Sequence, residues 1–144
     1  MDSAFWIIQG PGWAMIAYLT VAQCSSAISY ELGVRMGNQE PESRITAIGV
    51  AFWWGLALAD LVFYTPLLAL GLVAHLLNWD SAAILLAAAF GVTVYWPIAS
   101  LATVRRARNA KGWSLPKERQ YWLVLPVIAA WGLIGLGLLI AGKA

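Results

Sequence analysis

Four long apolar segments, separated by short polar connections, occupy most of this 144-residue chain. They run from about 4 to 30, 45 to 77, 82 to 104 and 121 to 141. A helix needs about 20 mostly apolar residues to cross the hydrocarbon core of a bilayer, so each segment is long enough to span it. The pattern predicts an all-α integral membrane protein. We expect a four-helix transmembrane bundle that forms one domain over residues 1–144.

Composition supports a membrane location. Hydrophobic residues make up 61% of the chain and charged residues 11%, whereas soluble domains are about one quarter charged. A small soluble fold keeps a large share of its surface in water and could not hide this much apolar area. The lipid bilayer is therefore the first expected partner.

The connections carry signals for turns and helix starts. Residues 78–81, Asn-Trp-Asp-Ser, form a connection so short that the second and third helices should be an antiparallel hairpin. Pro66 should bend or interrupt the long second segment. Ser114 is the residue type that commonly caps a helix start, so we expect it to cap the fourth helix.

Positive charge is distributed unevenly between the connections. Of the nine Lys and Arg residues, eight lie in the first and third connections. These eight are Arg35, Arg44, Arg105, Arg106, Arg108, Lys111, Lys117 and Arg119. Because positive loops stay in the cytoplasm, we expect both termini outside, in a plasma membrane that would be the inner membrane in a bacterium.

The densest basic run follows the third apolar segment. Arg105, Arg106, Arg108 and Lys111 should contact anionic lipid headgroups at the cytoplasmic face. The membrane orientation accounts for this run, so no nucleic-acid partner is expected.

Asp60 lies near the middle of the second segment, where a charged side chain is costly and commonly functional. One interpretation is an ion or proton site. The alternative is a protonated Asp that joins helices through hydrogen bonds. By depth in the membrane, its expected neighbours are Tyr64, Thr93 and Tyr95.

Polar residues of the first segment suggest a route to Asp60. Gln23 and Glu31 belong to a set at three- and four-residue spacing that runs toward the predicted cytoplasmic end. This set predicts either a wet path toward Asp60 or ordinary hydrogen bonding between helices.

Small residues recur at every fourth position in the middle segments. Such faces let helix backbones approach closely, so we expect them at helix contacts, either within the chain or between chains. These helix-packing candidates are Ala47, Ala51, Gly55 and Ala59 in the second segment and Ala83, Ala87 and Gly91 in the third.

Side chains for metal or nucleophilic chemistry are sparse. His75 is the one histidine and Cys24 the one cysteine, and a metal or haem normally needs several protein ligands. We therefore expect no metal, no cofactor and no enzymatic activity. An enzyme acting on lipid or quinone fits least, because acid–base partners are missing.

Two functions remain. The first is a small oligomeric ion channel or ion-coupled transporter with Asp60 as its intramembrane acidic site. The alternative is an accessory or structural subunit of a larger membrane complex, which the small-residue faces and the lack of cofactor ligands would suit.

Overall fold

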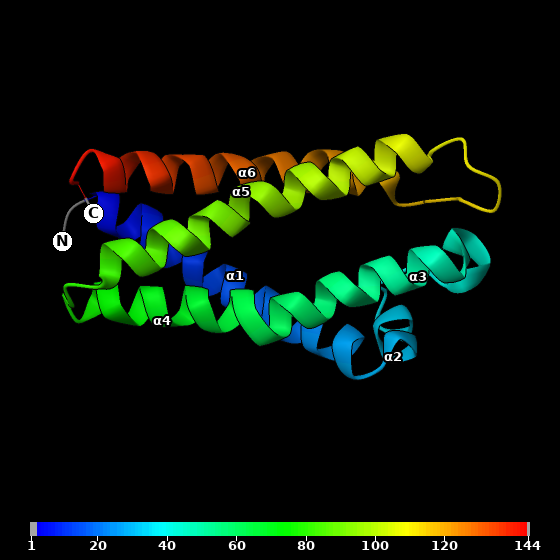
Figure 1. Ribbon diagram of the computed structural model, residues 1–144, viewed down its shortest axis with the longest axis horizontal. Helices are drawn as coiled ribbons and strands as arrows, with labels where there is room; N and C mark the ends of the chain where they lie inside the picture. Colours follow the sequence, from blue (N-terminus) through cyan, green and yellow to red (C-terminus); the bar gives the residue numbers. More distant parts are fainter. Residues whose placement is uncertain (1–2, 144) are drawn as a thin grey trace.

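The computed structural model describes residues 3–143, and this part of the chain contains helices and turns but no strand. In chain order, the elements are α1 (Ser3–Ile28), α2 (Tyr30–Arg35), α3 (Glu42–Ala59), η1 (Asp60–Tyr64), α4 (Thr65–Leu76), α5 (Ala82–Ala107) and α6 (Glu118–Ile140). The helices α3, η1 and α4 follow one another without a break and form one long rod (Figure 1).

Within residues 3–143, four helical stretches are long and apolar enough to cross a membrane. They are α1, the 35-residue rod from Glu42 to Leu76, α5 and α6. Large apolar side chains such as Ile48, Ile84 and Ile140 are exposed on the outside of the bundle, as a lipid-facing surface requires. The predicted all-α four-helix transmembrane bundle is confirmed.

The bundle has two distinct ends (Figure 1). The start of α1, the end of α6 and the α4–α5 turn lie at one end, called here the terminal end. The connections α2–α3 and α5–α6 lie at the other end, called here the basic end because these two connections and the helix ends beside them hold the eight Lys and Arg residues. The helices α5 and α6 run side by side, while α4 packs against α5 and α1.

Apolar packing is concentrated in the terminal half. The fully buried side chains there are Ile8, Leu68, Leu72, Leu86 and Phe90, drawn from α1, α4 and α5. The α6 helix fits closely against α5 because it presents glycine: a Cβ built on Gly135 would lie 2.5 Å from the Phe90 ring. This half of the bundle is therefore a closed apolar core.

The short turn between α4 and α5 confirms the expected hairpin. Asn78 takes a left-handed conformation with φ of 53°, which Asn tolerates better than most residues. The Trp79 N–H then donates to the Ala74 carbonyl at 2.9 Å, which closes the end of α4.

The start of the fourth span differs from the sequence-based prediction. The α6 helix begins at Glu118, with Lys117 and not Ser114 before it. The Ser114 N–H donates to the Arg44 carbonyl at 2.6 Å, so this residue joins the two basic-end connections. The prediction of a Ser114 cap is wrong because a contact between distant segments holds this residue away from the helix start.

The start of the second span also differs from a plain helix. The first turn of α3 is broken at Thr46, whose φ of 67° is rare for a β-branched residue. The chain therefore bends at the basic end just after Arg44. Between α1 and α3, a further short helix, α2, lies outside the spans.

Candidate functional site

Asp60 occupies a local widening of the long rod. It opens the π-helical turn η1, in which the Thr65 N–H donates to the Asp60 carbonyl five residues back. Such single π turns are rare and often occur at functional positions. The Asp60 side chain is 4% exposed, and its Oδ2 atom has no hydrogen-bond partner within residues 3–143. A buried carboxylate oxygen is thus left free to accept a proton or a ligand.

Two of the predicted neighbours meet one turn along from Asp60. The Tyr64 hydroxyl lies 2.7 Å from Thr93 Oγ1, and Thr93 donates to the Ala89 carbonyl at 2.9 Å. Tyr64 is therefore the donor in the first of these bonds. Tyr64 and Tyr18 are both close enough to Asp60 to interact with its charge.

The remaining predicted neighbours lie elsewhere. Tyr95 is 70% exposed on the outer face of α5. Glu31 is exposed in α2 and forms an ion pair with Arg35 at 2.6 Å. Gln23 is buried, with its Oε1 atom unpartnered. The structure thus brings Gln23 into the interior but leaves Tyr95 and Glu31 at the surface, because three- to four-residue spacing alone does not say which face turns inward.

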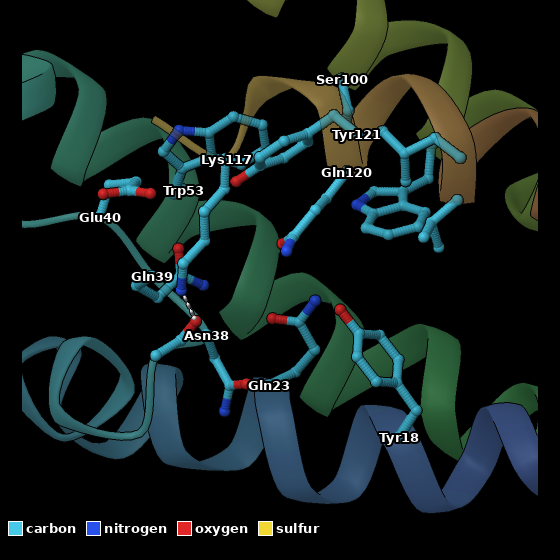
Figure 2. Close-up of a pocket in the computed structure, with 14 residues that line it drawn as sticks. Tyr18, Gln23, Asn38, Gln39, Glu40, Trp53, Ser100, Lys117, Gln120 and Tyr121 are labelled. Carbon is cyan, nitrogen blue, oxygen red and sulfur yellow. Dashed lines mark hydrogen bonds between the residues drawn. The ribbon is translucent and has the colours of Figure 1, made fainter. Parts of the chain in front are cut away.

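A cleft of about 300 Å³ opens at the basic end, between α1 and α3 on one side and α5 and α6 on the other (Figure 2). Sequence analysis did not single out most of its residues. Its principal polar and aromatic lining is Tyr18, Gln23, Trp53, Trp96, Ser100 and Tyr121. Tyr18 and Gln23 point into the space from α1, and Gln120 reaches into it from α6 (Figure 2).

The walls of this cleft hold buried polar groups without partners. The indole N–H of Trp53, the indole N–H of Trp96 and the Ser100 hydroxyl make no hydrogen bond within the described residues, and neither does Gln23 Oε1. Unpartnered buried polar groups are few in folded proteins and call for an explanation. Their concentration around one hollow marks it as a candidate binding site.

A sequence signal for part of this cleft exists. Thr93, Trp96 and Ser100 lie at three- and four-residue spacing and are all buried, so they share one face of α5. The equivalent face of α3 holds Trp53 and Ala57. Polar and indole residues in phase on neighbouring spans are the pattern that could have identified it.

The mouth of the cleft is held by contacts between the two basic-end connections. The Lys117 side chain extends toward the α2–α3 connection and donates to the Gly37 carbonyl at 2.9 Å (Figure 2). Glu40 accepts from Arg44 at 3.0 Å, and the Tyr30 hydroxyl donates to the Glu40 carbonyl at 3.0 Å. Burial raises the pKa of the Tyr30 hydroxyl, so it remains a neutral donor.

A second polar cluster lies at the terminal end and was also missed. Gln9 is 3% exposed and donates to the Leu72 carbonyl at 3.0 Å. Its side chain also lies 3.0 Å from Nδ1 of His75 and accepts from the Trp13 indole at 2.8 Å. Gln9 and its neighbours are thus satisfied by one another, and His75 serves as a contact between α1 and α4.

The predicted small-residue faces lie on the outside of the single chain. Ala47, Ala51, Gly55 and Ala59 are all exposed, and a Cβ on Gly55 would meet nothing within 4 Å. Likewise Ala83 and Gly91 are exposed and Ala87 is half-buried. The face of α3 that turns inward holds larger residues, such as Ile45 and Trp53. These candidates make no close packing within the chain, so contact between chains is the remaining expectation.

The predicted lipid-binding residues remain at the surface. Arg105, Arg106 and Lys111 are exposed just beyond the α5 span. Arg108 forms an ion pair with Glu118 at the start of α6. Three of the four cations are therefore free of ion pairs within residues 3–143 and stay available to anionic headgroups.

The fold defines a small polytopic membrane protein with an intramembrane acid and a cleft at its basic end. Among residues 3–143, no three His, Cys, Asp or Glu side chains gather as metal ligands would. No family model, curated protein or solved structure matches this chain. The function is therefore argued from the site itself.

Proposed function

We propose that this chain is a small proton-coupled transporter that works as an oligomer, with Asp60 as the group that takes up and releases the proton. The observation that carries the proposal is the position of Asp60 between an apolar core and a cleft. Its free Oδ2 atom is buried, and Tyr18, which lies within reach of its charge, also lines the cleft.

Access from one side favours a transporter over an open channel. The cleft is open at the basic end, whereas Leu68, Leu72, Leu86 and Phe90 fill the terminal half without exposure. A channel needs a continuous wet route, but a transporter needs access from one side at a time. The proposal therefore requires a second state in which the apolar core opens.

A proton suits this site better than a metal cation. One carboxyl group is sufficient to carry a proton by titrating. Hard cations take several oxygen ligands, and the nearest hydroxyls, on Tyr64 and Thr93, are engaged with each other. The proposal assigns no enzymatic reaction to the chain.

Orientation and assembly are further parts of the proposal. Under the positive-inside rule the basic end is cytoplasmic and both termini are outside, in a plasma membrane. The exposed face of Ala47, Ala51, Gly55 and Ala59 supports contact with a second helix. That same face favours the second candidate function, an accessory subunit whose partner is a different chain.

One substitution separates these functions. In proteoliposomes carrying a pH gradient, Asp60→Asn should fold and assemble normally yet abolish proton flux, because Asn keeps the size and loses the titrating group. The matched control is Asp80→Asn in the exposed α4–α5 turn, which should retain flux.

Three results would count against the transporter. The wild type could give no flux above empty liposomes across a pH gradient and several cation gradients. Asp60→Asn could retain wild-type flux. A stable companion of different sequence, co-purifying in mild detergent while Asp60→Asn is silent, would favour the accessory subunit.

A further inference from the structure

The cleft at the basic end carries an unbalanced positive charge. Lys117 makes no ion pair within residues 3–143, and its ammonium group donates to a neutral carbonyl, that of Gly37. The one acid in the lining, Glu40, is already paired with Arg44 at 3.0 Å. A ligand at the mouth therefore meets a cation whose charge no acidic side chain neutralises.

The unpartnered groups of the wall are mostly donors. An indole N–H can donate but not accept, and those of Trp53 and Trp96 have no partner within the described residues. The Ser100 hydroxyl is likewise unpartnered, although a hydroxyl can also accept. Gln23 Oε1 is the one unpartnered acceptor of the lining. The wall thus calls for a ligand rich in acceptors.

Aromatic rings shape the same space. Trp53 and Tyr121 lie with ring centroids 5.8 Å apart and planes at 41°, and Trp96 contributes a third ring to the lining. Flat apolar groups stack well on such rings. The volume of about 300 Å³ is at the small end of the usual range for ligand pockets.

We infer that this cleft binds a small organic anion, a carboxylate or phosphate attached to a flat apolar body. The anionic group lies at Lys117, and the flat body lies among Trp53, Trp96 and Tyr121. In its biological role this inference rests on the proposed function: the anion is the substrate whose movement is coupled to the proton on Asp60. Binding itself requires no transport, so it is tested separately.

A phospholipid headgroup presents the same anion chemistry. Val124 of α6 is 53% exposed and also lines the cleft, so an acyl chain could lie along it while the phosphate reaches Lys117. The experiment therefore needs one arm with soluble anions and one with anionic lipid.

The test is calorimetric titration of the intact protein in phosphatidylcholine nanodiscs with benzoate and with phenyl phosphate. Lys117→Gln should weaken binding roughly ten-fold, the usual effect of losing a charge-assisted hydrogen bond. Lys117→Arg should restore most of it. Trp96→Phe keeps a ring, loses the N–H and should weaken binding about five-fold.

Two controls accompany these variants. Lys111→Gln removes an exposed cation from the same connection but outside the cleft, and should leave binding unchanged. Asp60→Asn should still bind both probes even where proton flux is lost. The second control separates failure of the anion site from failure of the transporter.

The outcomes decide the inference. Binding of either soluble probe that depends on Lys117 and Trp96 supports a soluble anion. If neither probe binds, but phosphatidylglycerol is retained through purification by the wild type and lost by Lys117→Gln, the lipid headgroup is the source of the anion. No binding in either arm, or equal weakening by Lys111→Gln and Lys117→Gln, overturns the anion site.

Discussion

The Tyr64 hydroxyl in η1 donates to Thr93 Oγ1 in α5 across 2.7 Å, and both side chains are buried. This bond joins the π turn that begins at Asp60 to the neighbouring span. Because Thr93 also donates to the Ala89 carbonyl of its own helix, the Tyr64 ring is held in one position. The setting of Asp60 therefore depends on a contact between two spans.

Removing this bond should lower stability modestly. Tyr64→Phe deletes the hydroxyl and should cost about 0.6 kcal/mol, the average worth of a hydrogen bond between membrane helices. Tyr95→Phe is the control, because Tyr95 is 70% exposed and should unfold like the wild type. Unfolding in mixed detergent micelles measures both variants. Equal losses in the two variants would contradict the structural role of the Tyr64 bond.

Close packing of α6 on α5 predicts a position-specific effect of adding one methyl group. Gly135→Ala would place a Cβ 2.5 Å from the Phe90 ring and should cost about 1–3 kcal/mol as overpacking. Gly137→Ala, two residues along the same helix, meets nothing within 4 Å and should be neutral or slightly stabilising. Thermal unfolding in detergent compares the two. A neutral Gly135→Ala would mean that α6 lies farther from α5.

Contact between chains is testable at Gly55. This residue is exposed in the single chain with open space at its Cβ, so Gly55→Leu should leave the fold of one chain intact. If the small-residue face meets another helix, the added side chain should shift the protein toward smaller assemblies in size-exclusion chromatography with light scattering. Ala130→Leu, at an exposed position of α6, is the control. Unchanged assembly of Gly55→Leu would remove this face from the interface.

The orientation of the bundle predicts opposite labelling of its two ends. In a Cys24→Ala background, cysteines introduced at Ser3 and at Ala110 should react with a membrane-impermeant maleimide from opposite sides. Ser3 opens α1 at the terminal end, whereas Ala110 lies in the α5–α6 connection at the basic end. Positive-inside charge predicts that the Ser3 position reacts from outside intact cells. Reaction of the Ala110 position from outside would reverse the orientation.

The α4–α5 hairpin and the four spans could be predicted from the sequence because they depend on local pattern. A run of apolar residues as long as a bilayer is thick has few other ways to satisfy its backbone than a helix. The connection at Asn78 and Trp79 is short enough to force its neighbours antiparallel. The burial of Asp60 also followed, because an acid at mid-membrane must turn toward protein or water.

Which face of each span turns inward was decided by tertiary structure. In α3, Ala47 and Gly55 repeat with the same spacing as Ile45 and Trp53, yet the first pair is exposed and the second buried. A helix that is apolar all round gives no moment to distinguish its faces. The sequence-based choice of the small residues for contacts within the chain therefore had no physical basis beyond size.

The cleft likewise depends on long-range arrangement. Lys117 and Gly37 meet across the basic end, and Trp53 comes to lie beside Tyr121, although long stretches of chain separate each pair. Local apolar length determined that this chain crosses the membrane and where it turns. The separation of α3 from α5 and α6, which creates the hollow, was decided by side-chain packing between spans, because only the shapes of facing side chains set how closely two apolar helices approach.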